Sequence, residues 1–101
     1  MKYLAVVQVT ITDDSWVESY VPAASALVAK HGGRYLVRTQ TMEKIEGDAD
    51  LPNVFVIFEW PSKEAFHAFY DDPDYQSFKQ SRLAGSTGAF TLVAVEDVFA
   101  S

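Results

Sequence analysis

Hydrophobic and polar residues alternate with a period of two in four stretches of the chain. This is the period of a β-strand, whose side chains point to opposite faces of a sheet. In the first and third stretches both alternating sets of positions are largely apolar, which is typical of strands inside a sheet. The pattern predicts strands over residues 2–12, 34 to about 41, 54–60 and 89 to about 98.

Between the first two strands, hydrophobic residues recur every three to four positions and predict a helix. Asp13-Asp14-Ser15 offers N-caps, and Gly32-Gly33 can close the helix because glycine adopts positive backbone angles. Pro22 lies inside the pattern, so we expect either a kink there or a helix that properly begins at Pro22. The inward stripe consists of Trp16, Tyr20, Ala24, Leu27 and His31.

The segment after the third strand predicts a second helix and then a short third one. Pro61-Ser62 ends the strand and caps the second helix, whose inward face holds Ala65, Phe66, Phe69 and Tyr70. The acidic residues and the proline of residues 71–74 favour the start of another helix. Residues 84–88 end this helix. One side of this short helix carries Tyr75, Phe78, Arg82 and Leu83.

The element order is strand, helix, strand, strand, helix, strand, and it predicts an α+β, ferredoxin-like βαββαβ fold. In this fold both helices cross one face of a four-stranded antiparallel sheet. The other face would remain bare although three of the four strands are apolar on both sides, and a soluble monomer rarely exposes so much apolar surface. We therefore expect a homodimer packed sheet against sheet, a dimeric α/β barrel.

Composition narrows the classes of partner. At 101 residues the chain is expected to form a single domain, 1–101. Eight Lys and Arg against fourteen Asp and Glu give a net charge of −6, which argues against nucleic acid and anionic membranes as partners. The chain has no cysteine, and its apolar N-terminal run is too short to span a bilayer. A cytoplasmic location fits these features best.

Four motifs together give the chain a resemblance to a bacterial family. They are HGGRYLVR at 31–38, EGD at 46–48, EWPS at 59–62 and FYDDPDYQ at 69–76, in this order. The chain resembles the family known as domain of unknown function 1330, within the dimeric α/β-barrel superfamily. The resemblance implies the fold and the dimer. It transfers no catalytic residues, and the superfamily includes cofactor-independent monooxygenases, isomerases and binding modules.

Arg38 is the first candidate for chemistry, because an arginine in the middle of a strand needs a carboxylate or an anionic ligand. In the second predicted strand the alternation places Arg34 and Arg38 on one face and Tyr35 and Val37 on the other. Glu59 on the third strand is the expected partner. Either Arg38 and Glu59 form a structural ion pair, or Arg38 binds an oxyanion with Glu59 as acid or base.

His31 is the third catalytic candidate, since it lies on the inward stripe at the helix C-terminus. Its alternative role is to end the helix by bonding a backbone carbonyl. Aromatic residues with polar tips could line a cleft for a planar molecule. We therefore expect the ligand to be bound by Trp16, Tyr20, Arg38 and Tyr70. The alternative is that the three aromatic rings belong to the hydrophobic core. Two histidines far apart predict no metal site, and no motif requires a cofactor.

Three functions follow from these features. The preferred one is a small homodimer that binds an apolar or anionic small molecule between its helices and sheet. The second is a cofactor-independent enzyme, monooxygenase- or isomerase-like, that uses the same pocket with Arg38 and with His31 or Glu59. The third is a structural dimer module, which would need an apolar patch outside the dimer interface.

Overall fold

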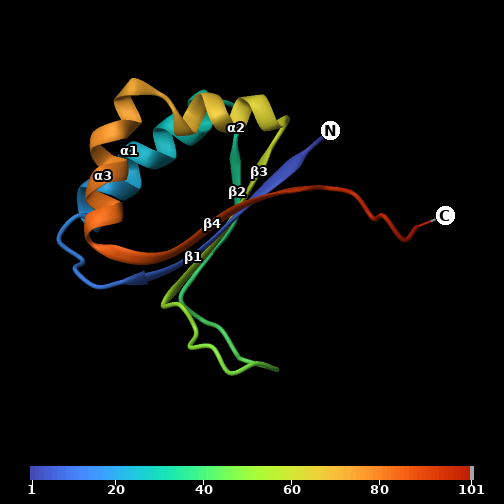
Figure 1. The fold of residues 1–101 in the computed structure, drawn as a ribbon. Coiled ribbons are helices and arrows are strands. Elements are labelled where there is room, and N and C mark those ends of the chain that lie inside the picture. The colour runs from blue at the N-terminus through green and yellow to red at the C-terminus, as the bar shows by residue number, and fades with distance from the viewer. Residues whose placement is uncertain (101) are drawn as a thin grey trace.

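One antiparallel sheet carries every helix on the same side (Figure 1). The computed structural model describes residues 1–100. The strands are β1 (Tyr3–Ile11), β2 (Arg34–Thr39), β3 (Val54–Trp60) and β4 (Ser86–Ala94). The helices are α1 (Val17–Lys30), α2 (Lys63–Tyr70), the short 3-10 helix η1 (Pro73–Tyr75) and α3 (Gln76–Ala84).

The strand order β2-β3-β1-β4 confirms the predicted ferredoxin-like fold. The two central strands, β1 and β3, are those whose residues are apolar on both faces. Antiparallel pairing runs from Tyr3↔Trp60 to Val9↔Val54 between them. In this register each residue of β1 that points towards the helices is paired with a residue of β3 that also points towards the helices.

The helix α1 begins at Val17 and continues through Pro22, so the expectation of a helix that begins at Pro22 is wrong. The bounds of one strand also differ from the prediction. The strand β4 begins at Ser86 and ends at Ala94, several residues earlier than expected at both ends. Its extent follows its partner, because β1 pairs from Ile11↔Ser86 to Tyr3↔Ala94 and offers no strand beyond Tyr3.

A register shift in β2 overturns the predicted faces of that strand. Tyr35 pairs with Phe58, Val37 with Ile57 and Arg38 with Val56, so Leu36 is an extra residue without a partner. An extra residue of this kind reverses the alternation that follows it. Arg38 therefore shares a face with Tyr35, not with Arg34 as the simple period of two predicts.

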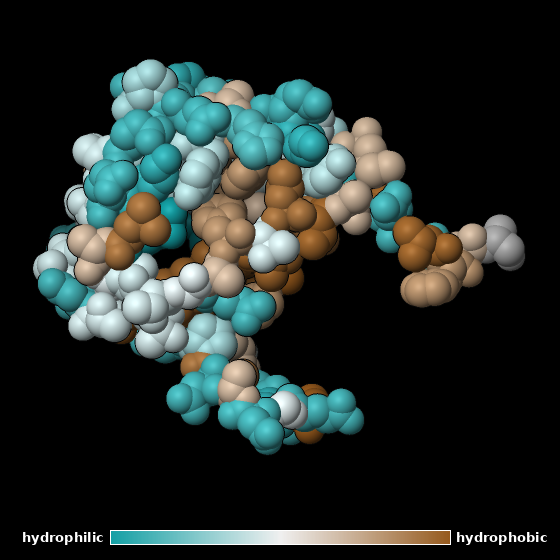
Figure 2. Space-filling model, in the orientation of Figure 1, coloured by the Kyte–Doolittle hydropathy of each residue, from teal (hydrophilic) through white to brown (hydrophobic). Residues whose placement is uncertain are grey.

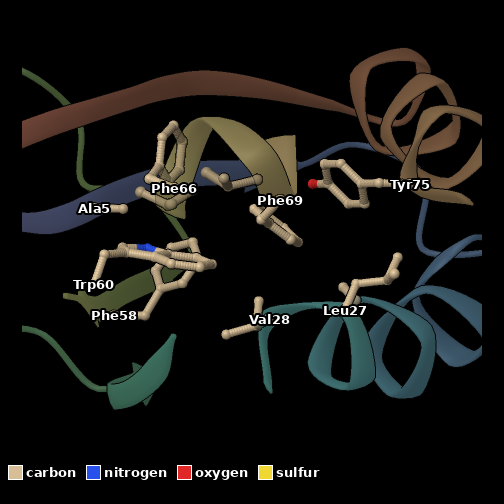
Figure 3. Close-up of a cluster of buried hydrophobic side chains, with 11 residues drawn as sticks. Ala5, Leu27, Val28, Phe58, Trp60, Phe66, Phe69 and Tyr75 are labelled. Carbon is tan, nitrogen blue, oxygen red and sulfur yellow. The ribbon is translucent and has the colours of Figure 1, made fainter. Parts of the chain in front are cut away.

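The hydrophobic core lies between the sheet and the helices (Figure 3). Phe58 and Trp60 from β3 meet Phe66 and Phe69 from α2, while Val28 closes the cluster from α1. Ser62 caps α2 as expected, since its hydroxyl accepts a hydrogen bond from the Ala65 amide at 3.1 Å. None of the helices in residues 1–100 has the length and hydrophobicity needed to cross a membrane.

The face of the sheet opposite the helices carries apolar side chains that no helix covers. We call this the open face, and its apolar residues are Leu4, Val6, Val37, Phe55, Ile57 and Val93. The β2–β3 connection and the segment after β4 both extend away from the helices (Figure 1). Figure 2 shows hydrophobic side chains in the hollow between these two projections.

Gly88 has a steric reason to be glycine. Its φ is +154°, and a Cβ there would lie 2.0 Å from the Gln8 carbonyl oxygen of β1.

We predict that Gly88→Ala lowers the free energy of unfolding by about 3 kcal/mol, because strain and overpacking combine. Gly47→Ala is the control, since φ is +109° but no atom lies within 4 Å, and it should cost about 1 kcal/mol. Equal urea midpoints for the two variants would contradict the steric explanation.

Candidate functional site

A cavity of about 600 Å³ lies between the helices and the inward face of the sheet. This volume is within the range of small-molecule sites. Its walls are mainly aliphatic and aromatic side chains of β1, β3 and α1, with Phe90 from β4. The polar side chains that reach it come from Tyr20, Ser25, Tyr35, Arg38, residues 39–41 and Arg82.

Arg38 lines one wall of the cavity as a consequence of the extra residue at Leu36. Its guanidinium carbon lies 3.8 Å from the centre of the Tyr35 ring, and its Nη1 donates to Ser25 Oγ at 3.0 Å. A guanidinium held against an aromatic ring and bonded to a hydroxyl has a restricted orientation. The residue is largely exposed, so it lies where the cavity meets solvent.

Arg82 also lines the cavity, but it is only 7% exposed. Its Nε and Nη2 atoms are shielded from solvent and have no hydrogen-bond acceptor, and it forms no salt bridge within residues 1–100. Its guanidinium carbon lies 5.5 Å from the Phe90 ring centre. Burial lowers the pKa of Arg82, but the nearby hydroxyls of Tyr75 and Tyr20 outweigh this effect and the pKa is raised. Arg82 therefore remains a buried cation.

Two tyrosine hydroxyls lie close to this cation. Tyr20 Oη from α1 and Tyr75 Oη from η1 are 2.5 Å apart and share a hydrogen bond. Burial, followed by the neighbouring Tyr75, raises the pKa of Tyr20 far above its ordinary value. Burial also raises the pKa of Tyr35. The hydroxyls of Tyr20 and Tyr35 thus stay protonated at neutral pH and act as hydrogen-bond partners, not as proton acceptors.

The cavity contains cationic residues without acidic ones. Two of the three arginines of the chain line it, and within residues 1–100 no Asp, Glu or His does. The interior of the cavity is therefore electropositive although the chain as a whole carries −6. Over the same residues, no group of three His, Asp or Glu side chains is arranged to hold a metal ion.

Glu59 lies away from the cavity, on the open face. Its Oε1 is 3.4 Å from Lys2 Nζ and 3.5 Å from Arg34 Nη2. The expected Arg38–Glu59 ion pair is not formed, because the extra residue at Leu36 turns Arg38 to the opposite face. The structure brings Glu59 together with the other arginine of β2.

His31 caps the C-terminus of α1, does not line the cavity and contacts Asp72 instead. His31 Nε2 and Lys30 Nζ lie 2.7 Å and 2.9 Å from Asp72 Oδ2. Asp72 Oδ1 accepts a hydrogen bond from the Asp74 amide at 2.9 Å, which caps η1. The Asp72 side chain is 5% exposed. This cluster joins the end of α1 to the start of η1.

Of the four residues expected to bind ligand, Tyr20 and Arg38 line the cavity, whereas Trp16 and Tyr70 do not. Trp16 Nε1 donates to the Gly85 carbonyl at 3.3 Å, and the indole packs edge-on against Tyr20. Tyr70 stacks on Phe66, with Lys79 Nζ 4.4 Å from its ring centre. Both rings support the walls of the core from outside the cavity.

Sequence reasoning did not select Arg82 as a site residue. A signal was present, because Arg82 shares one side of its helix with Tyr75 and Phe78, so a cation occupies an inward position of an amphipathic helix. Charged residues are rarely buried without a partner. A periodic pattern cannot tell whether such a residue is paired, so its environment emerges only from the packing of α3 on Tyr20 and Phe90.

The chain belongs to the family described as domain of unknown function (DUF1330), whose model matches residues 2–97. This agrees with the resemblance carried by the four sequence motifs. No curated protein matches the chain significantly.

Solved structures share the fold at low sequence identity. A protein of unknown function, RPA0582 from Rhodopseudomonas palustris, is 16% identical with a TM-score of 0.83, over 95% of this chain and 83% of its own. SnoaB, a cofactor-independent oxygenase from Streptomyces nogalater, is 20% identical with a TM-score of 0.66, over 99% and 98%. Rv0793 from Mycobacterium tuberculosis is 14% identical with a TM-score of 0.54, over 97% and 99%.

The buried cluster around Asp72 predicts a pH dependence of stability. Hydrogen bonds from His31, then Lys30 and the Asp74 amide, hold the pKa of Asp72 well below its ordinary value of 3.8. A depressed pKa stabilises the folded state above pH 3.8, and this contribution is lost as the pH falls below that value. Asp72→Asn should therefore lower the urea midpoint at pH 7, and the difference from the unmodified chain should shrink towards pH 3.

Asp71→Asn is the matched control, because Asp71 is exposed and forms no salt bridge in the described chain. Its urea midpoints should follow those of the unmodified chain at every pH. A difference for Asp72→Asn that stays constant from pH 7 to pH 3 would show that the charge of Asp72 does not stabilise the fold.

Proposed function

We propose that this protein is a homodimer in which each copy binds a small apolar or anionic molecule in the cavity between helices and sheet. The observation that carries the binding function is the cavity itself, about 600 Å³ with mainly apolar walls and a few polar side chains. Sites for small molecules usually have this composition and size. Arg38 and Tyr20 are the proposed contacts on two of its walls.

The open face supports the homodimer. Its apolar residues run across all four strands, and Val93 is 40% exposed. A second copy suits this face because a two-fold axis pairs an apolar stripe with itself. Lys2 and Arg34 both pair with Glu59 at one end of the stripe, so these charged groups lie away from its apolar middle. A stable interface needs about 800 Å² from each partner.

Ile57→Glu tests the dimer, because it places a charge in the middle of the open face, where Ile57 lies opposite Val6 and Val37. Burying an unpaired carboxylate is strongly unfavourable, so the variant should sediment as a monomer at about 10 µM, where the unmodified chain sediments as a dimer. Ala29→Glu on an exposed position of α1 is the control and should remain dimeric. A monomeric unmodified chain would refute the proposal.

Ligand binding is tested by thermal stability with a panel of small aromatic acids and their neutral counterparts. A ligand at 100 times its dissociation constant should add about 2.7 kcal/mol to the free energy of unfolding. Val21 lines the cavity and is 44% exposed, so Val21→Trp should occupy its entrance and weaken binding by about tenfold or more. Ala29→Trp, on an exposed position of the same helix, should bind normally. A flat response to the whole panel would favour the structural dimer module.

A cofactor-independent enzyme is the second candidate. The fold likeness to SnoaB, described as a cofactor-independent oxygenase, spans 99% of this chain and supports this possibility. Because no Asp, Glu or His of residues 1–100 lines the cavity, a reaction there would favour a substrate that arrives already ionised, with Arg38 oriented towards its oxyanion. Oxygen uptake with readily ionised phenols, absent in Val21→Trp, would support the enzyme.

A further inference from the structure

We propose that Arg82 is the anion-binding residue of the cavity and that the ligand held there carries an oxyanion, a carboxylate or a phenolate, on an otherwise apolar body. This inference rests on the proposed binding function and makes it more specific. It assigns the charge of the ligand and the residue that recognises it. Arg38 then contributes at the solvent side of the same cavity.

The first support is the unbalanced charge of Arg82. Burying an ion without a partner is costly, and arginine cannot escape the cost by losing its proton. Arg82 is nevertheless 7% exposed, with two nitrogen atoms that have no acceptor and no carboxylate partner in the described chain. The indole nitrogen of Trp60 also lacks an acceptor, but it is neutral and outside the cavity lining. An anion in the cavity would compensate this cation.

The second support is the set of groups around the guanidinium. Tyr20 lines the cavity, and its hydroxyl shares a hydrogen bond with that of Tyr75, so one of the two hydroxyl protons is used between them. When Tyr75 is the donor of that bond, the Tyr20 hydroxyl can donate its own proton to an oxyanion in the cavity. Phe90 and Phe69 provide apolar and aromatic walls for the remainder of the ligand. Because Nε and Nη2 of Arg82 are shielded, the guanidinium acts on a carboxylate or phenolate in the cavity mainly through its delocalised charge.

The third support is the absence of competing acids. A carboxylate of the protein near Arg82 would neutralise it and repel an anionic ligand. The lining residues include none within residues 1–100, although the chain contains fourteen acidic residues. The cavity is therefore positive inside a negatively charged protein. This arrangement selects anions at the site and does not attract them to the rest of the surface.

The test compares charged and neutral probes of equal shape by isothermal titration calorimetry at pH 7. The probe pairs are 2-naphthoate with 2-naphthamide, and 4-nitrophenolate with 4-nitroanisole. In the unmodified chain at least one anion should bind about tenfold or more tightly than its neutral counterpart, as expected for a hydrogen bond to a charged group. The pair that shows the preference distinguishes a carboxylate ligand from a phenolate ligand.

Arg82→Met should abolish the preference while the neutral probe binds as before. This variant is expected to fold, because an apolar residue of similar length replaces a buried unpaired charge. Arg82→Lys should keep part of the preference. Lys79→Met is the matched control, since it removes one positive charge from the same helix outside the cavity lining, and it should keep the preference intact.

The outcomes separate this inference from the proposed function. If neutral and anionic probes bind the unmodified chain equally, or if Arg38→Met abolishes the preference and Arg82→Met does not, the assignment to Arg82 is wrong while the cavity still binds ligand. If no probe binds at millimolar concentration, the binding function fails and the assignment fails with it. An anion preference lost only in Arg82→Met establishes Arg82 as the recognising residue.

Discussion

The pairing of β1 with β4 along its whole length, and with β3 from Tyr3 to Val9, is the constraint on which the other layers depend. Its inward positions, Ala5, Val7 and Val9, form part of the core, and Val7 and Val9 also line the cavity. Its outward positions, Leu4 and Val6, belong to the open face. A strand with two apolar faces has to be covered twice. The helices cover it once, and the proposed second copy covers it again.

A single extra residue in β2 determines which polar groups meet in the cavity. Without the shift at Leu36, Arg38 would lie on the open face with Arg34 and Glu59. With the shift, Arg38 packs against the Tyr35 ring beneath α1, and Glu59 forms ion pairs with Lys2 and Arg34. Bulges of this kind often re-aim a side chain near a functional site. The electropositive character of the cavity follows directly, because no acid accompanies the arginine inward.

Asp72 and Arg82 are both buried charged residues, but only Asp72 has oppositely charged partners beside it. Asp72 is buried with His31 and Lys30 beside it and with a backbone amide as a further donor, so its charge is compensated within the fold. Arg82 is buried between tyrosines and Phe90 without a counter-charge. A compensated cluster serves to join α1 to η1, whereas an uncompensated cation stores free energy that a bound anion can release.

The sequence by itself determined the fold class, the central position of β1 and β3 and the apolar open face. These properties follow from the hydrophobic periodicity of the sequence. This periodicity is local, because it is set by residues that lie close together along the chain. The cap at Ser62 and the inward stripe of α1 were equally visible, because capping and helical spacing are local rules.

Only the tertiary structure decided the composition of the cavity. A one-residue shift reverses every later side chain of a strand, and no period of two shows where it occurs. Whether Arg82 has a partner, and whether His31 faces the cavity or Asp72, depends on segments that are far apart in the sequence. Such contacts depend on how elements pack, and the spacing along one element does not contain that information.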